Sequence, residues 1–194
     1  MPKDLKAYVA DYFAGLKATL DAIAVTDLKG HPLDFFLGMD RAAALIKERT
    51  AAGNKLMFIG NGASAAISSH MATDFWKNGG MRAVAFNDGA LLTCIGNDFG
   101  YEQVFAKPIE RFADPGDLLV AISSSGQSPN ILLGVDAARR QGCRSLTLSG
   151  FKPDNPLRSL GDYNFYVPAH QYGPVEILHH AVCHCILEAI IMSK

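Results

Sequence analysis

The fold of this chain is decided by the stretch Ala121-Ile122-Ser123-Ser124-Ser125-Gly126-Gln127-Ser128-Pro129-Asn130. It follows the apolar run 118–120 and leads into an apolar segment, 131–133, that is typical of a helix start. A buried strand that opens into a hydroxyl-rich turn before a helix forms an anion site, because hydroxyls and free backbone N–H groups converge there. The helix N-terminus adds roughly half a positive charge. The turn lacks the Gly-Lys pair of a Walker loop, so it favours a phosphorylated metabolite over a nucleoside triphosphate.

Length and composition indicate one compact domain. The chain has 194 residues, 49% of them hydrophobic, and a formal charge of −1, which suggests neither a nucleic-acid nor a membrane partner. We expect a single domain over 1–194, with N-terminal helices over 1–53 and an α/β core over 54–194. No apolar run approaches the roughly 20 residues that cross a bilayer, and the first residues lack a signal-peptide pattern. The four cysteines lack a metal-binding or disulfide spacing, so a cytoplasmic protein with reduced thiols is expected.

Helical and strand patterns alternate along the chain. Two amphipathic helices, over 5–24 and 34–52, are expected before the first strand. Further on, we expect strands at 55–59, 82–86, 117–122, 144–149 and 163–167, and helices at 64–77, 89–97, 103–112, 130–141 and 174–192. This alternation predicts an α/β fold in which a doubly wound parallel sheet is covered by helices on both faces. Ligands of such sheets bind at the carboxyl ends of the strands. Small polar turns follow two of these strands, at 60–64 and 123–128, and are expected to face one ligand.

Two helices carry groups that can do chemistry. His70 and Asp74 stand four residues apart, so they share one helix face. Glu176, His180 and His184 form a second stripe at the same spacing, with His179 beside it. Imidazoles and carboxylates bind zinc or act as acid and base, and the sequence does not choose between these roles. One histidine alone is more often a hydrogen-bonded core residue, but two matched stripes in a protein with an anion-binding turn favour a functional site.

Three motifs together resemble a known family. They are Gly60-Asn61-Gly62-Ala63-Ser64-Ala65-Ala66, Gly96-Asn97-Asp98-Phe99-Gly100 and the serine stretch 122–130. The chain is similar to sugar isomerase (SIS) domains and, more narrowly, to the phosphoheptose isomerases. The resemblance implies a five-stranded parallel sheet with an N-terminal helical extension, and a homotetramer with active sites between subunits. It also implies conversion of sedoheptulose 7-phosphate to D-glycero-D-manno-heptose 7-phosphate through an enediolate, in heptose biosynthesis.

The resemblance also implies roles for single residues. Substrate-binding positions are Asn61, Ser64, Asp98, Ser123, Ser124, Ser125 and Ser128. Catalytic positions are Asp74, Glu176 and His184, and the positions of a divalent metal, expected to be zinc, are His70, Asp74, Glu176 and His184. No nucleotide cofactor is implied. The chain departs from the family at four places: Asp74 replaces a glutamate, Glu176 a glutamine, Asn78 an arginine and Gly173 an aspartate.

Two other functions fit the same residues. A SIS domain can bind a sugar phosphate without turning it over, as a regulatory protein or as a partner in replication initiation. His184 and the carboxylate of Asp74 argue against this alternative, because a module that only binds has no need of acid–base groups. An isomerase for a shorter sugar phosphate or an amino-sugar phosphate is the other alternative.

Overall fold

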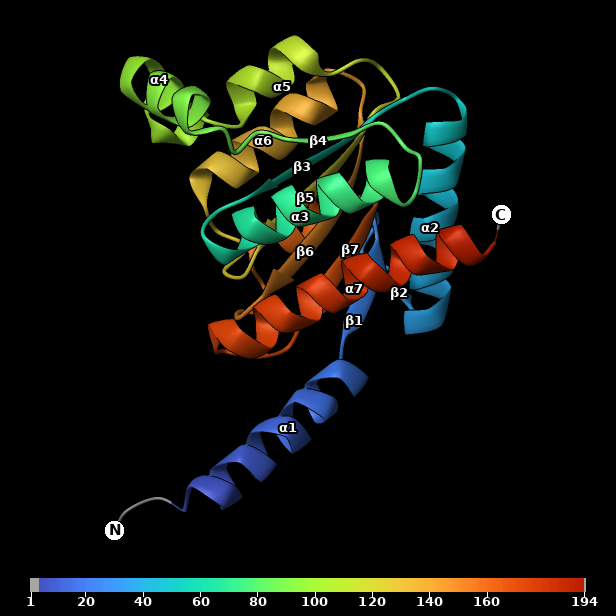
Figure 1. Ribbon diagram of the computed structural model, residues 1–194, viewed down its shortest axis with the longest axis vertical. Helices are drawn as coiled ribbons and strands as arrows, with labels where there is room; N and C mark the ends of the chain where they lie inside the picture. Colours follow the sequence, from blue (N-terminus) through green and yellow to red (C-terminus); the bar gives the residue numbers. More distant parts are fainter. Residues whose placement is uncertain (1–3, 194) are drawn as a thin grey trace.

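A seven-stranded sheet forms the centre of the computed structural model, which describes residues 4–193 (Figure 1). Its strands are β1 Ala24–Asp27, β2 Pro32–Leu33, β3 Leu56–Gly60, β4 Ala83–Ala85, β5 Leu118–Ser123, β6 Arg144–Gly150 and β7 Tyr163–Val167. Their order is β2-β1-β7-β6-β5-β3-β4. The strands from β7 to β4 pair in parallel, so the five predicted parallel strands are confirmed. Residues Gly60 and Ile122 pair in the register of β3 and β5, which brings the turns after these strands together.

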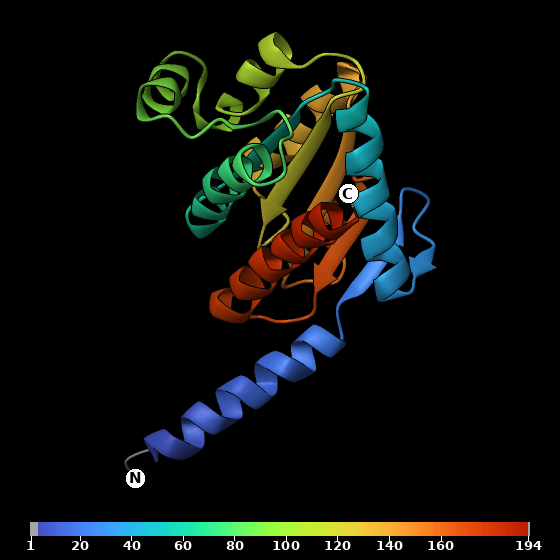
Figure 2. The same cartoon turned by 45° about the vertical axis from the view of Figure 1, so that its right-hand side comes forward.

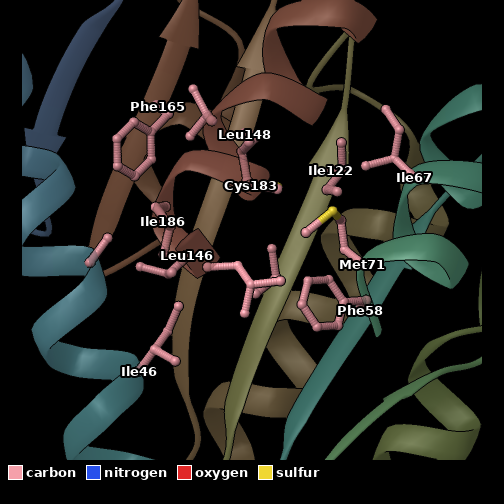
Figure 3. Close-up of a cluster of buried hydrophobic side chains, with 14 of the residues drawn as sticks. Ile46, Phe58, Ile67, Met71, Ile122, Leu146, Leu148, Phe165, Cys183 and Ile186 are labelled. Carbon is pink, nitrogen blue, oxygen red and sulfur yellow. The ribbon is translucent and has the colours of Figure 1, made fainter. Parts of the chain in front are cut away.

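Helices cover both faces of the sheet, as expected for a doubly wound fold. The α-helices are α1 Leu5–Asp21, α2 Phe35–Ala51, α3 Ala63–Lys77, α4 Gly89–Phe99, α5 Ala106–Phe112, α6 Pro129–Arg140 and α7 Tyr172–Met192, and the 3-10 turns are η1 Tyr101–Gln103 and η2 Pro156–Ser159. One core lies between the sheet and α2, α3 and α7, and Figure 3 shows Ile46, Met71 and Cys183 of these helices in it. A second core lies under α5 and α6. Alternate residues of one strand enter opposite cores, as Phe58 and Met57 of β3 do.

The sheet has two strands that the sequence did not predict. A hairpin of β1 and β2 lies between the first two helices, and β1 pairs antiparallel with β7. Asp27 closes its turn by accepting hydrogen bonds from the backbone N–H groups of Lys29 and His31, at 2.8 and 2.9 Å. These strands are too short and too polar to produce an apolar run, so periodicity could not reveal them. The expectation of two helices directly before the first strand was therefore wrong.

The predicted helix over 103–112 is divided. A 3-10 turn occupies Tyr101–Gln103, and α5 begins only at Ala106. Pro108 has no amide hydrogen and is tolerated only within the first turn of a helix, so it fixes where α5 starts.

The first and last helices differ sharply in their packing. None of the residues of α1 is buried, and the helix projects from the body of the molecule in both views (Figures 1 and 2). Helix α7 lies beside α3 on the same face of the sheet. By length and composition α7 is apolar enough to span a membrane, which corrects the expectation that no such segment exists, yet 44% of its most apolar stretch is buried inside the fold. A core helix of this kind meets the same criterion without crossing a bilayer.

Candidate functional site

A polar pocket lies where β3 and β5 end. It has a volume of about 130 Å³ and is lined by Asn61, Ser64, Ser123, Ser124, Ser125, Ser128, Tyr172 and Glu176. Six of these residues are the substrate-binding positions expected from the sequence. Glu176 is the one charged residue among those that line it. Complete ligand pockets usually measure some 300–1,000 Å³, so this pocket has room for one end of a sugar phosphate.

Burial and backbone contacts hold the serine turn in one conformation. Ser123 and Ser124 are only 5% and 6% exposed, and the backbone N–H of Gly126 donates to the Ser123 carbonyl at 3.1 Å. Gly126 has a φ of +62°, and a Cβ added there would lie 1.9 Å from Oδ1 of Asn155. Only glycine fits this position. The turn is therefore preorganised: the hydroxyls of Ser123 and Ser125 also accept hydrogen bonds from the backbone N–H groups of Gly126 and Gln127, at 3.2 and 3.3 Å.

A pair of asparagines joins the turn after β3 to the serine turn. The amide nitrogen of Asn61 donates to Oδ1 of Asn130 at 2.9 Å, and that of Asn130 donates to Oδ1 of Asn61 at 2.8 Å. The hydroxyl of Tyr101 donates to Asn61 Oδ1 at 3.3 Å. Asn130 is buried next to the N-terminus of α6. The pair thus fixes the distance between the turn after β3 and the serine turn.

Helix α7 supplies the aromatic wall of the pocket. The ring of Tyr172 packs edge-on against Phe151, with ring centroids 4.9 Å apart. Phe151 has a φ of +56°, which is rare for a residue other than glycine. Such strain persists only where surrounding contacts hold it, and here it directs an aromatic side chain toward the first turn of α7. Glu176 lies one turn further along that helix.

A cluster of three imidazoles lies between α3 and α7. His70, His180 and His184 each offer one ring nitrogen within 4.8 Å of the others. The ring centroids of His180 and His184 are 4.5 Å apart, and those of His70 and His180 are 5.1 Å apart. Asp74 Oδ2 is 3.3 Å from His70 Nε2 and 4.0 Å from His184 Nδ1. The two predicted helix stripes therefore meet, as a functional site requires.

The cluster fits a divalent metal. Nε2 of His180 is buried and has no hydrogen-bond partner within residues 4–193, although buried polar atoms are nearly always paired. Burial lowers the pKa of His180, and the nearby rings of His184 and His70 lower it further while Asp74 opposes them. A neutral imidazole is the form that binds zinc. Three imidazoles and a carboxylate are donors that zinc accepts.

The adjacent His179 has a structural role. It is fully buried, and its Nε2 donates to the carbonyl of Ser149 at 3.0 Å. Burial lowers its pKa to about 4, so the ring is neutral near pH 7. It ties α7 to the end of β6.

Asp98 lies away from the pocket. It is exposed on α4 and accepts hydrogen bonds from its own helix, from Asn97 Nδ2 at 2.9 Å and Cys94 Sγ at 3.6 Å. Within residues 4–193 it does not line the pocket. The resemblance places it near the substrate, and the structure of one chain does not bring it there.

The family resemblance implied no role for three residues at the site. His180 stood in the predicted stripe, but the resemblance gave it no role, and only the meeting of α3 and α7 puts it against His70. Asn130 belonged to the quoted serine motif, where an amide pairing with a residue 69 positions away leaves no local signal. Tyr172 carries no motif at all. Each contact is long-range, so spacing along the chain could not reveal it.

Comparison with known proteins agrees with this geometry. Residues 11–150 match the family model of the SIS domain. The phosphoheptose isomerase of Akkermansia muciniphila is 37% identical over 158 residues, which cover 78% of this chain and 83% of that protein.

Solved structures match over nearly the whole chain. Phosphoheptose isomerase from Neisseria gonorrhoeae superposes with a TM-score of 0.84 at 28% identity, covering 96% of this chain and 99% of the other. The enzyme from Francisella tularensis gives a TM-score of 0.85 at 24% identity with full coverage of both chains; at this identity the match supports the fold alone. The chain therefore belongs to the SIS domain family, and within it to the phosphoheptose isomerases.

Proposed function

We propose that this protein interconverts sedoheptulose 7-phosphate and D-glycero-D-manno-heptose 7-phosphate by proton transfer through an enediolate. One observation carries the proposal: uncharged anion-binding groups and the carboxylate of Glu176 line the same pocket. The imidazole cluster stands on the same helix as Glu176. A binding module needs the first set of groups only.

The serine turn is suited to the phosphate end of the substrate. The hydroxyls of Ser123, Ser124, Ser125 and Ser128 donate hydrogen bonds to phosphate oxygens, and the N-terminus of α6 favours their negative charge. Because these donors are fixed before binding, the phosphate holds the carbon chain in one register. Such positioning contributes a large share of the rate in reactions of this type. Ser64 and Asn61, from the turn after β3, close the other side of the pocket.

Isomerisation then needs groups that move protons at the carbonyl end. A base takes a proton from C1 of the ketose, the enediolate forms, and a proton is delivered to C2, while the proton of the C1 hydroxyl is lost and the C2 oxygen gains one. Glu176 and Asp74 are the carboxylates available, and His184 is the opposing acid–base group. The pocket lining includes the carboxylate of Glu176, whereas Asp74 lies against two imidazoles.

A divalent metal, with zinc the ion we expect, would be held by His70, Asp74, Glu176 and His184, the positions that the family resemblance implies. When bound, it would supply polarisation of the sugar carbonyl and stabilise the developing negative charge. The chain's own residues supply the phosphate grip and the proton transfer.

We infer a homotetramer with sites between subunits. Helix α1 exposes Leu5, Tyr8, Val9, Phe13 and Leu20, has no fully buried residue, and packs only Leu16 against the core of its own chain. A helix of this kind is stabilised by a partner. A second apolar groove runs between α2 and α7, lined in part by Phe36, Met39 and Ile186. Two separate self-contact surfaces suit four copies better than two, and the small pocket leaves room for a neighbouring chain to complete the site.

The state of the cysteines indicates the cell compartment. The four cysteines are free thiols, which supports a reducing cytoplasm. We therefore place the reaction at an early, cytoplasmic step of heptose biosynthesis.

The test combines turnover with binding. The purified protein is incubated with sedoheptulose 7-phosphate, with and without added zinc, and the aldose product is followed by NMR. We expect His184→Ala to lower kcat by at least about 100-fold, while the substrate still raises Tm as it does for the unaltered protein. Binding without turnover by the unaltered protein, across several ketose phosphates, would favour the regulatory alternative instead.

A further inference from the structure

We propose that Tyr101 and Asn130 are positioning residues, which together make the side chain of Asn61 a hydrogen-bond donor only toward the ligand of the pocket. The three residues come from the 3-10 turn η1, the first turn of α6 and the turn after β3. Of the three, Asn61 is the one that lines the pocket. The sugar part of the ligand rests on the proposed function, whereas the polarity of Asn61 does not.

The hydrogen bonds of Asn61 leave one donor free. A side-chain amide has an oxygen with two lone pairs and a nitrogen with two hydrogens. Both lone pairs of Asn61 Oδ1 are occupied, by Asn130 Nδ2 at 2.8 Å and by the Tyr101 hydroxyl at 3.3 Å. One hydrogen of Asn61 Nδ2 is donated to Asn130 Oδ1 at 2.9 Å. The second hydrogen has no protein acceptor within residues 4–193, so it is available to a ligand in the pocket.

Asn130 sets the direction of this amide. Its Oδ1 also accepts the backbone N–H of Ile131 at 3.0 Å. If the Asn130 amide were flipped, its NH2 group would face that N–H, and two donors would oppose each other. Asn130 is only 3% exposed, so water does not compensate for such a loss. The backbone of Ile131 therefore determines that Asn61 turns its oxygen toward Asn130 Nδ2 and keeps a hydrogen for the ligand.

Tyr101 occupies the remaining lone pair of Asn61. Without its hydroxyl, Oδ1 would keep a free acceptor site, and the amide would be held from the Asn130 side alone. The bond from Tyr101 is the longest of the three, so its effect on binding is moderate. The ring is 59% exposed and lies against Gly96 of α4, where an added Cβ would be 4.0 Å from Cδ2 of Tyr101. Removing the hydroxyl therefore changes the hydrogen bonding of Asn61 and leaves the ring contact in place.

A donor-only amide suits a phosphate. A phosphate ester near pH 7 is mostly a dianion, whose terminal oxygens only accept hydrogen bonds. Serine hydroxyls both donate and accept, so the serine turn alone does not distinguish a phosphate from a sugar hydroxyl. The free N–H of Asn61 adds a preference for an acceptor at this end of the pocket.

Binding of inorganic phosphate, measured by isothermal titration calorimetry, tests the proposal independently of turnover. Tyr101→Phe removes only the hydroxyl, Asn61→Ala removes the amide on which it acts, and the double variant completes a mutant cycle. Asn130→Ala removes the other partner. Tyr163→Phe is the matched control, because it also removes one hydroxyl but lies at the start of β7, away from the pocket. Circular dichroism and Tm check that each variant is folded, and the Tyr101 cycle decides the outcome if Asn130→Ala does not fold.

We expect Tyr101→Phe to weaken phosphate binding about 5-fold and Asn130→Ala at least about 10-fold, with Tyr163→Phe within about twofold of the unaltered protein. In the Asn61→Ala background, Tyr101→Phe should have no further effect, because Tyr101 acts through Asn61. With sedoheptulose 7-phosphate, Tyr101→Phe should raise KM by about the same 5-fold and leave kcat within about twofold, as lost ground-state binding requires.

Three results would overturn the proposal: Tyr101→Phe binds phosphate as well as the unaltered protein, Tyr101→Phe weakens binding equally with and without the Asn61 amide, or the folded unaltered protein binds no phosphate. Phosphate binding that follows the expected pattern, in a protein that turns over no ketose phosphate, would reject the isomerase function and leave the roles of Tyr101 and Asn130 standing.

Discussion

Replacing Gly126 by alanine tests whether the serine turn is as rigid as the structure indicates. Two costs add. The φ of +62° places an alanine in the left-handed region, which costs about 1 kcal/mol. The new Cβ would also stand 1.9 Å from Oδ1 and 2.4 Å from Cγ of Asn155, so the asparagine must move.

Asn155 cannot move without loss. It is 3% exposed, its amide nitrogen donates to the carbonyls of Gly150 and Lys152 at 3.1 and 2.8 Å, and its Oδ1 accepts from Arg158 N at 3.1 Å. Leaving buried groups of this kind unpaired costs about 1–3 kcal/mol. We therefore expect Gly126→Ala to lower the free energy of unfolding by about 3 kcal/mol, adding the two costs.

Gly142→Ala is the matched control. Gly142 has a φ of +76°, but its added Cβ would meet only Pro115, at 3.5 Å. It carries the backbone cost alone, about 1 kcal/mol. Urea unfolding at one fixed protein concentration measures both variants, and the rise in Tm on adding sedoheptulose 7-phosphate reports the turn. Equal destabilisation of the two variants, or an unchanged ligand-induced rise in Gly126→Ala, would refute the reasoning.

Two further predictions concern stability and assembly. Burial raises the pKa of Asp117, but hydrogen bonds from Lys55 and from the Asp114 N–H, together with the charge of Lys55, outweigh burial, so the pKa is lowered. The ion pair therefore stabilises the fold above about pH 4. Its contribution is lost as the pH falls through the lowered pKa. Asp117→Asn should cost about 3 kcal/mol at pH 7 and progressively less below pH 4, as read from urea midpoints at each pH, and a constant difference would contradict this. Phe13→Glu places a charge on the exposed face of α1 and should shift the mass measured by light scattering from four chains toward smaller species, with the secondary structure by circular dichroism retained; an unchanged mass would remove α1 from the interface.

The sequence predicts the elements with strong local patterns. The five parallel strands and the covering helices follow from alternating periodicity, because buried strands and amphipathic helices each have a distinct repeat. The β1–β2 hairpin was missed because its stability comes from pairing with β7 and from the Asp27 turn, and neither produces an apolar repeat.

The site shows the same division between local and distant information. The serine turn and the residues 60–64 carry their chemistry in consecutive residues, so the pocket lining could be proposed from the sequence. Grouping His180 with His70, and pairing Asn61 with Asn130, depends on how α3 packs against α7 and how β3 aligns with β5. These contacts join residues far apart in the chain, and only three-dimensional packing determines them.

The central claim is that uncharged donors of the serine turn hold the phosphate while groups on α3 and α7 isomerise the other end of the sugar. Its most direct test compares kcat/KM for sedoheptulose 7-phosphate with that for sedoheptulose lacking the phosphate. Binding energy from a remote group is expressed in turnover as well as in affinity, so we expect the phosphate to raise kcat/KM by at least about 1,000-fold. Equal values for the two sugars, or no turnover of either, would contradict the account.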